Sequence, residues 1–258
     1  MITKKNTFFL TFIAISQFFL CSFYLSVNAQ NNYKYQYEVV KMDSTHDKDA
    51  DLTMETYLSH LKQEKDKVMN VPIGTSKEVL SSYSPLSPLS NLLVDMLFEW
   101  GNEYLLSQKM VKADLALLNF GGIRAALPKG RITIGDIYEI IPFDNTVTFV
   151  FVKGSELKKM FNRFTLKNNA PLANVQLIYG TENLSSYTIG GAPLELDKIY
   201  TLTTINFLAR GGDGFLSDLN FESTIYLNQL LRDVYIEAIR AKTAQGIEIE
   251  GGIDDRCR

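Results

Sequence analysis

The chain has 258 residues, of which 46% are hydrophobic and 21% are charged, and this supports one substantial core or two small ones. Its formal net charge of −3 gives no reason to expect a nucleic acid or an anionic membrane surface as a partner. With 2 histidines and 2 cysteines, it has little material for a metal site.

The first residues predict a secretory signal peptide. Lys4 and Lys5 precede an apolar run from Phe8 to Val27, and Val27-Asn28-Ala29 supplies the small residues of a cleavage site. We expect residues 1–29 to be removed after Ala29 and the protein to be exported, to the periplasm or the extracellular space, with no membrane span remaining. An uncleaved membrane anchor is the alternative.

The cysteines and histidines predict neither a disulfide nor a metal site. Cleavage removes Cys21 and leaves Cys257, so no intrachain disulfide can form. His46 lies in a polar stretch, and His60 falls on an amphipathic pattern where a surface histidine is the simpler interpretation. We expect this chain to hold no metal ligands, no cofactor and no catalytic residues.

The mature chain begins with an extension, residues 30–48, whose alternating segment 33–42 predicts a short strand. Apolar residues at helical spacing predict a helix within 49–69, capped by Asp49 or Asp51 and ended by 70–76. A Ser/Pro-rich connector, residues 81–90, precedes an amphipathic helix that we expect to follow Ser90.

The second half mixes strands and helices. Strands are predicted at 113–118, 145–154, 174–180, 184–191 and 198–205, and turns at Gly130 and Gly135 flank the start of a short helix near Ile137. Two further helices are predicted, one capped by Ser155 and one over 224–244. The order lacks strict β-α-β alternation, which favours an α+β fold in a single domain, residues 49–258.

The stretch NFGGIRAALPKG, residues 119–130, places two glycines between an asparagine and an arginine at the end of a predicted strand. Glycine tolerates a positive φ and leaves its N–H open to a ligand, while Arg124 adds a fixed positive charge. Asn119, Gly121, Gly122 and Arg124 therefore form a candidate site for a phosphate or a hydroxyl-rich ligand. A Gly-Gly hairpin turn with a surface arginine is the alternative.

A second stretch, INFLARGGDGF at 205–215, follows another predicted strand. In its glycine-rich loop, Asp213 has a carboxylate suited to accept hydrogen bonds from the two hydroxyls of a ribose. A tight turn closed by a local aspartate hydrogen bond is the alternative.

The third stretch, IPFDN at 141–145, starts a loop because Pro142 excludes helix at Ile141. Phe143 is either an exposed stacking face or a core anchor, and Asn145 either reads the edge of a base or caps the turn. Together with Phe207, these residues supply what a purine nucleotide requires, since stacking on an aromatic ring is worth roughly 1–3 kcal/mol per base.

In combination, these motifs resemble the C-terminal domain of the 5'-nucleotidase / UDP-sugar hydrolase family, over roughly Asp49 to Ile249. The resemblance implies a layered α/β/β/α sandwich that binds the nucleoside part of the substrate. It further implies that two phenylalanines stack on the base, that an asparagine bonds to it and that the aspartate holds the ribose hydroxyls. The implied substrate-binding residues are Asn119, Gly121, Gly122, Arg124, Phe143, Asn145, Phe207, Gly212 and Asp213.

The chain departs from the family in two respects. Many members carry an arginine before the helix that here follows Ser90, whereas this chain has Ser82-Tyr83-Ser84-Pro85-Leu86 without a positive charge. Family enzymes also carry an N-terminal metallophosphatase domain with a two-metal site, and the residues before position 49 leave no room for one.

The sequence thus predicts the substrate-recognition half of a split 5'-nucleotidase, with a separate metallophosphatase chain that supplies the divalent metals. A stand-alone exported nucleoside-binding module is the alternative, and a degenerate domain with a structural role is a third possibility.

Overall fold

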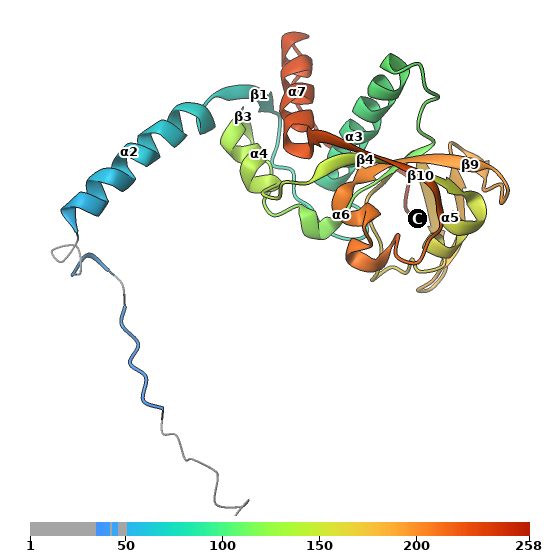
Figure 1. The fold of residues 1–258 in the computed structure, drawn as a ribbon, viewed down its shortest axis with the longest axis horizontal. Coiled ribbons are helices and arrows are strands. Elements are labelled where there is room, and N and C mark those ends of the chain that lie inside the picture. Colours follow the sequence, from blue (N-terminus) through green and yellow to red (C-terminus); the bar gives the residue numbers. More distant parts are fainter. Residues whose placement is uncertain (1–34, 42, 46–50) are drawn as a thin grey trace, which may run out of the picture. The chain divides into compact units, whose positions relative to one another are not determined.

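The structure is a computed structural model that describes residues 35–41, 43–45 and 51–258 (Figure 1). The predicted signal peptide at 1–29, His46 and Asp49 lie outside the described residues. The chain divides into two compact units, Met1–Glu55 and Thr56–Arg258. In the first unit, residues 35–41 are exposed and carry no regular secondary structure, so the strand predicted there is wrong. An alternating pattern does not form a strand without a partner strand for its backbone groups.

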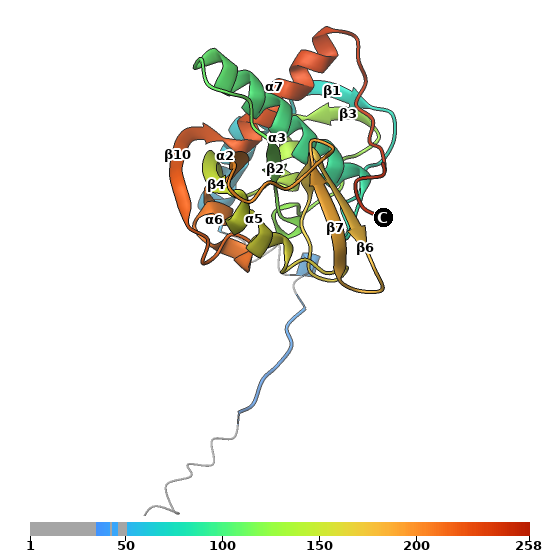
Figure 2. The same ribbon diagram turned by 90° about the vertical axis from the view of Figure 1, so that its right-hand side faces the viewer.

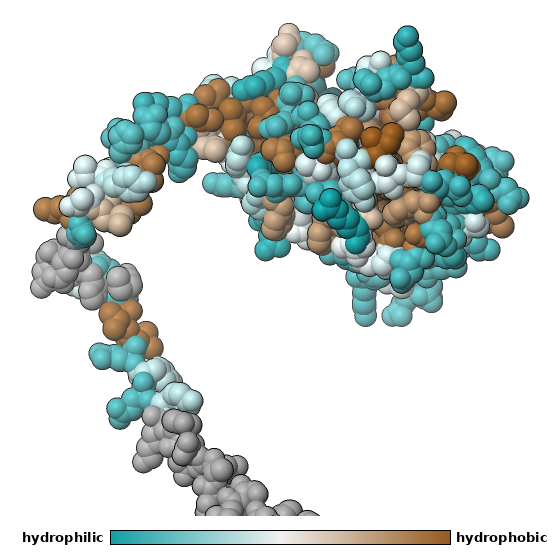
Figure 3. All heavy atoms as spheres, in the orientation of Figure 1, coloured by the Kyte–Doolittle hydropathy of each residue, from teal (hydrophilic) through white to brown (hydrophobic). Residues whose placement is uncertain are grey.

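Helix α2, Leu52–Met69, confirms the predicted helix and its cap. The Asp51 carboxylate accepts hydrogen bonds from the backbone N–H groups of Thr53 and Met54 at 2.9 and 3.2 Å, as an N-cap residue does. None of the residues of α2 is buried, and Figure 3 shows apolar groups exposed along it. Its apolar spacing therefore predicts the helix correctly but not a buried face.

The remaining elements form a mixed α+β fold, as predicted, around a five-stranded sheet of order β10-β4-β9-β2-β5 (Figures 1 and 2). The strands of this sheet are β2 (Leu115–Leu117), β4 (Thr146–Lys153), β5 (Leu172–Ala173), β9 (Ile199–Ile205) and β10 (Phe221–Leu230). Two smaller sheets are formed by β1 (Pro72–Ser76) with β3 (Gly130–Thr133), and by β6 (Val175–Tyr179), β7 (Leu184–Ile189) and β8 (Ala192–Pro193). The other helices are α3 (Pro88–Ser107), α4 (Ile134–Ile140), α5 (Gly154–Phe161), α6 (Asn206–Ala209) and α7 (Leu231–Ala244).

The core lies between α3 and the five-stranded sheet. Helix α3 packs against β2, β5 and β9, and its Val94 and Leu97 are completely buried. Trp100 and Tyr104 continue this face as a ladder of stacked rings that ends on Phe149 of β4, with centroid separations of 5.4 and 5.6 Å. Apolar burial on this scale is the main stabilising contribution of such a domain.

Several predicted boundaries are corrected by pairing that the local sequence does not reveal. The long helix expected from residue 224 begins at Leu231, because 221–230 form β10 and pair with β4. Strand β1 occupies part of the segment expected only to end α2. Helix α3 begins at Pro88 after Ser87, before the expected Ser90.

Two local predictions concerning caps and turns are also wrong. Lys153, rather than Ser155, occupies the N-cap position of α5, and its side chain makes no capping hydrogen bond. Gly130 has a positive φ of 88° but begins strand β3 rather than lying in a turn, and Gly135 lies inside α4, which Thr133 and Asp136 cap reciprocally.

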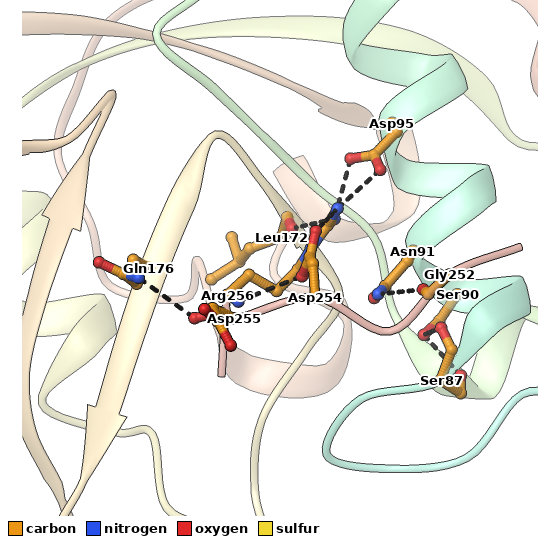
Figure 4. A network of polar contacts seen from close by, with 10 residues as sticks. All are labelled: Ser87, Ser90, Asn91, Asp95, Leu172, Gln176, Gly252, Asp254, Asp255 and Arg256. Atoms are coloured by element: carbon orange, nitrogen blue, oxygen red, sulfur yellow. Dashed lines mark hydrogen bonds and ion pairs between the residues drawn. The ribbon is translucent and has the colours of Figure 1, made fainter. Parts of the chain in front are cut away.

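The C-terminal segment, residues 245–258, is fastened across the domain (Figure 4). The guanidinium of Arg256 donates to both carboxylate oxygens of Asp95 on α3 at 2.8 and 2.7 Å, and also to Asp254 and to the Leu172 carbonyl. Backbone hydrogen bonds join residues 256–258 to Leu177 of β6. We call this set of contacts around Arg256 the C-terminal clasp.

Within the part of the chain that the structure describes, none of the helices combines the length and apolar character needed to cross a bilayer.

Candidate functional site

The topology of the main sheet brings the three predicted motifs to one edge. Strands β2 and β9 are parallel neighbours, with Ala116 opposite Thr203, so their carboxyl ends meet. Strand β4 runs antiparallel to β9, with Val147 opposite Ile205, so β4 begins where β9 ends. The segments that follow β2 and β9 therefore lie together with the loop that precedes β4, and the segment after β9 begins with the short helix α6 before its glycine-rich loop.

These segments enclose a cavity of about 190 Å³, which we call the slot. Phe143 and Phe207 both border the slot, with 47% and 43% of their surface exposed. Neither ring is a core anchor, because a core phenylalanine such as Phe149 is fully buried. The residues that line the slot are Asn119, Gly121, Gly122, Phe143, Asn145, Phe207 and Asp213.

Gly212 lies beneath the ring of Phe207. A Cβ at this position would come within 2.4 Å of the ring, closer than any real contact. The ring can therefore lie in this position only because residue 212 has no side chain.

Asn119 and Asp213 form the polar side of the slot. The Asn119 carboxamide, which is buried, donates a hydrogen bond of 2.7 Å to the Asp213 carboxylate. Asp213 itself is exposed and has φ of 53°, a left-handed conformation that aspartate tolerates better than most residues. One carboxylate oxygen is thus engaged by the protein, and the exposed carboxylate remains accessible to a hydroxyl-bearing ligand.

The double glycine has a role different from the one expected. Gly121 and Gly122 are not among the residues with positive φ, and they belong to a short 3₁₀ turn, η2 (Phe120–Gly122), rather than a hairpin. The N–H of Gly122 donates to the Asn119 carbonyl at 3.2 Å, so it is not held open for an anion. A Cβ on Gly122 would come within 2.7 Å of Oδ1 of Asn119, so this glycine provides the space for the Asn119 side chain.

Arg124 and Gly212 do not line the slot. The Arg124 side chain is exposed and donates to the Gly121 carbonyl at 3.3 Å, while its backbone N–H bonds to Ile140. Asp213 is therefore the charged residue among those that line the slot, and its charge is negative.

Asn206 and Arg232 hold the segments that carry Phe207 and Phe143, and neither is among the site residues expected from the sequence. The Asn206 carboxamide oxygen accepts from the N–H of Phe207 at 2.9 Å and from that of Thr146 at 3.1 Å, which joins α6, where Phe207 lies, to the start of β4 just after the Phe143 loop. Arg232, which is buried, donates to the Pro142 carbonyl at 3.0 Å and pairs with Asp144.

Asn206 and Arg232 differ in how far the sequence around each of them identifies its role. Asn206 stands directly before Phe207 in the quoted motif and could have been chosen for that reason. Arg232 lies about ninety residues from its partners, so nothing near it in the sequence identifies them.

The residues described do not fit a two-metal centre. Across residues 35–41, 43–45 and 51–258, no group of three or more His, Cys, Asp or Glu side chains is arranged to hold a metal ion. His60 is exposed on α2, as expected.

Fold and slot together define an α+β domain with a cavity at one edge of its main sheet, which is lined by two aromatic side chains and one carboxylate. Residues 72–218 match the family described as 5'-nucleotidase, C-terminal domain, and the chain belongs to this family. The match covers more than half of the chain and all three of the motifs that border the slot.

Curated relatives and solved structures agree with this assignment. The chain is 38% identical over 108 residues to Protein UshA of Yersinia enterocolitica and 35% identical over 109 residues to a 5'-nucleotidase of Vibrio cholerae. Each match covers 40% of this chain and 20% of the relative, so the chain matches about a fifth of their length. A 5'-nucleotidase precursor of Thermus thermophilus has the same fold, with a TM-score of 0.66 at 22% identity, over 79% of this chain and 42% of that structure.

Proposed function

We propose that this chain is the nucleotide-recognition half of a split 5'-nucleotidase, in which a separate metallophosphatase chain provides the metals and the chemistry. The observation that carries the proposal is the slot itself, where Phe143 and Phe207 border one cavity beside Asp213. A planar base fits between aromatic side chains, and a ribose diol fits a carboxylate. In this role the chain contributes binding energy and positioning rather than bond-making groups.

One observation favours a second candidate, a stand-alone nucleoside-binding module. The charged residue that lines the slot is Asp213, while Arg124 is exposed outside it and the Ser/Pro-rich connector, residues 81–90, has no positive charge. A negative carboxylate without a facing arginine suits a neutral nucleoside better than a phosphate-bearing nucleotide.

Calorimetric titration with adenosine and AMP tests the slot in either role. We expect Phe143→Ala and Phe207→Ala each to weaken binding by at least about 1 kcal/mol, because each removes one stacking face. Phe151→Ala, on β4 and away from the slot, is the matched control once its folding is verified. Unchanged affinity in both slot variants would mean that the slot is not the nucleoside site.

A phosphate-release assay separates the two candidates. We expect no release from AMP by this chain with Mn²⁺ or Zn²⁺ alone, and release when a metallophosphatase chain that co-elutes with it on gel filtration is added. Hydrolysis by the isolated chain would contradict the split arrangement. Tighter binding of adenosine than of AMP, with no restored hydrolysis, would favour the stand-alone module.

The proposal includes export, which is supported by Lys4, Lys5 and the apolar run Phe8–Val27. N-terminal sequencing of the protein from the secreted or periplasmic fraction should begin at Gln30. An intact N-terminus in the membrane fraction would instead identify the run as an anchor.

A further inference from the structure

The loop that carries Asp213 is held by an arginine that belongs to none of the three motifs. Arg163, two residues after the end of α5, is half-buried and directs one nitrogen, Nη1, into the loop. Nη1 lies 2.6 Å from the Gly214 carbonyl and 2.7 Å from the Ser217 carbonyl, with longer contacts of 3.2 Å to Phe215 and to the Ser217 hydroxyl. The two short contacts account for the two hydrogens of Nη1.

The loop needs such support because its backbone adopts energetically unfavourable dihedral angles. Between residues 211 and 218, φ is positive at Gly211 (94°), Asp213 (53°), Gly214 (76°) and Asp218 (59°). A non-glycine residue keeps a left-handed conformation only where surrounding contacts fix it. Arg163 supplies such contacts to the loop that follows Asp213, while the carboxamide of Asn119 holds the Asp213 carboxylate.

All four Arg163 contacts go to uncharged oxygen atoms of the loop, within four residues of Asp213. An arginine that served only as a surface charge would gain nothing from three carbonyl groups. Hydrogen bonds from a charged donor are stronger than neutral ones, so these contacts restrict the loop effectively.

We propose that Arg163 is a positioning residue that fixes the Asp213 carboxylate for the sugar of a bound nucleoside, and thereby sets selectivity for ribose. The inference rests on the proposed nucleoside site. Its effect can nevertheless be measured separately from binding as a whole, because Arg163 acts through Asp213 and not through the aromatic side chains. Loss of Arg163 therefore weakens the sugar contribution and leaves stacking of the base intact.

The experiment compares adenosine with 2',3'-dideoxyadenosine by calorimetric titration of the full chain. We expect the wild type to prefer adenosine by about tenfold or more, since the diol bonds to a charged acceptor. Asp213→Ala should abolish this preference. Arg163→Met should remove most of it while binding dideoxyadenosine as the wild type does, and Arg163→Lys, which keeps a cationic donor, should restore part of it.

Exposed Arg240 on α7 provides the matched control, and Arg240→Met should retain the full preference. If Arg163→Met does not fold, Arg163→Lys decides the matter, because the inference requires its preference to fall between those of the wild type and Asp213→Ala.

The two proposals fail in different ways. Full preference in Arg163→Met, or equal weakening of both ligands, would overturn the role of Arg163 and leave the nucleoside site standing. A wild type that binds neither ligand would overturn the proposed function, and this inference with it.

Discussion

At the scale of single residues, the slot depends on two glycines that leave space for neighbouring groups as much as on the side chains that line it. Gly212 leaves room for the Phe207 ring, and Gly122 leaves room for the Asn119 carboxamide. Both are close approaches, where any Cβ would displace a group that borders the cavity.

Gly212→Ala should therefore impair binding more than folding. The new methyl group would lie 2.4 Å from the Phe207 ring, which is exposed and can move away at modest cost to stability. We expect nucleoside affinity to fall by about 1 kcal/mol or more, the value of one stacking face, with a smaller change in the free energy of unfolding. Gly252→Ala is the control, because a Cβ there meets no atom within 4 Å. Equal affinities of the two variants for adenosine would contradict this account.

The residues of the slot were predictable from sequence, but the reasons for some of them were not. Phe143, Phe207 and Asp213 stand in segments next to strands, and this local signal was sufficient, although Phe207 lies in the short helix α6 and not in a loop. The double glycine predicted a special backbone, whereas the structure uses its lack of volume at Gly122. Arg163 acts on residues about fifty positions away, a relation that only the fold creates.

At the scale of elements, the C-terminal clasp joins the last segment to α3 and β6. Its guanidinium, Arg256, bonds to Asp95 and Asp254, and these hydrogen bonds raise its pKa although burial acts in the opposite direction. Cys257, the next residue, is a half-buried free thiol whose pKa is raised by burial. Burial therefore favours the protonated, less reactive form of this thiol, and the contacts of Arg256 hold the neighbouring segment in place.

Arg256→Ala should expose the thiol. Without the contacts to Asp95 and Asp254, local opening of residues 254–258 needs less free energy, so the rate of Cys257 labelling by a thiol reagent should rise at least about threefold. Arg258→Ala, which removes only an exposed ion pair to Asp255, should change the rate little. Labelling of native Arg256→Ala at the wild-type rate would show that the clasp does not protect the thiol.

The clasp should also weaken in acid. The hydrogen bond from Arg256 lowers the pKa of Asp254 below its ordinary value of 3.8. A carboxylate with a lowered pKa in the folded state stabilises the protein fully above the unfolded value, and this contribution is lost as pH falls through the folded value. The difference in free energy of unfolding between wild type and Asp254→Asn should thus be constant above about pH 5 and shrink below 3.8. A difference that grows on acidification would contradict this assignment.

The helices and strands show which parts of the fold local sequence patterns can predict and which they cannot. The strands β4 and β9 and the helix α3 were expected because each carries a strong apolar pattern. Residues 221–230 were assigned to the following helix, because their pairing with β4 is a tertiary property. The meeting of the three segments depends on the parallel pairing of β2 with β9, which no local pattern specifies.

At the scale of the whole molecule, two helices whose apolar residues recur with similar helical periodicity have different surroundings, and α3 is also the more apolar of the two. Helix α3 buries Leu97 completely against the sheet, whereas Leu58 on α2 keeps 55% of its surface exposed. The domain should therefore draw its stability from α3, and α2 should contribute little to it.

A matched pair of substitutions tests this division. Leu97→Ala should reduce the free energy of unfolding by about 2–5 kcal/mol, because it leaves a cavity in a packed core. Leu58→Ala removes the same atoms from an exposed position and should change it by less than about 0.5 kcal/mol. Chemical denaturation of both variants measures the two values, and circular dichroism checks that α2 remains helical. A loss in Leu58→Ala comparable to that in Leu97→Ala would show that α2 packs its apolar face in solution, and the domain would then depend on α2 for its stability.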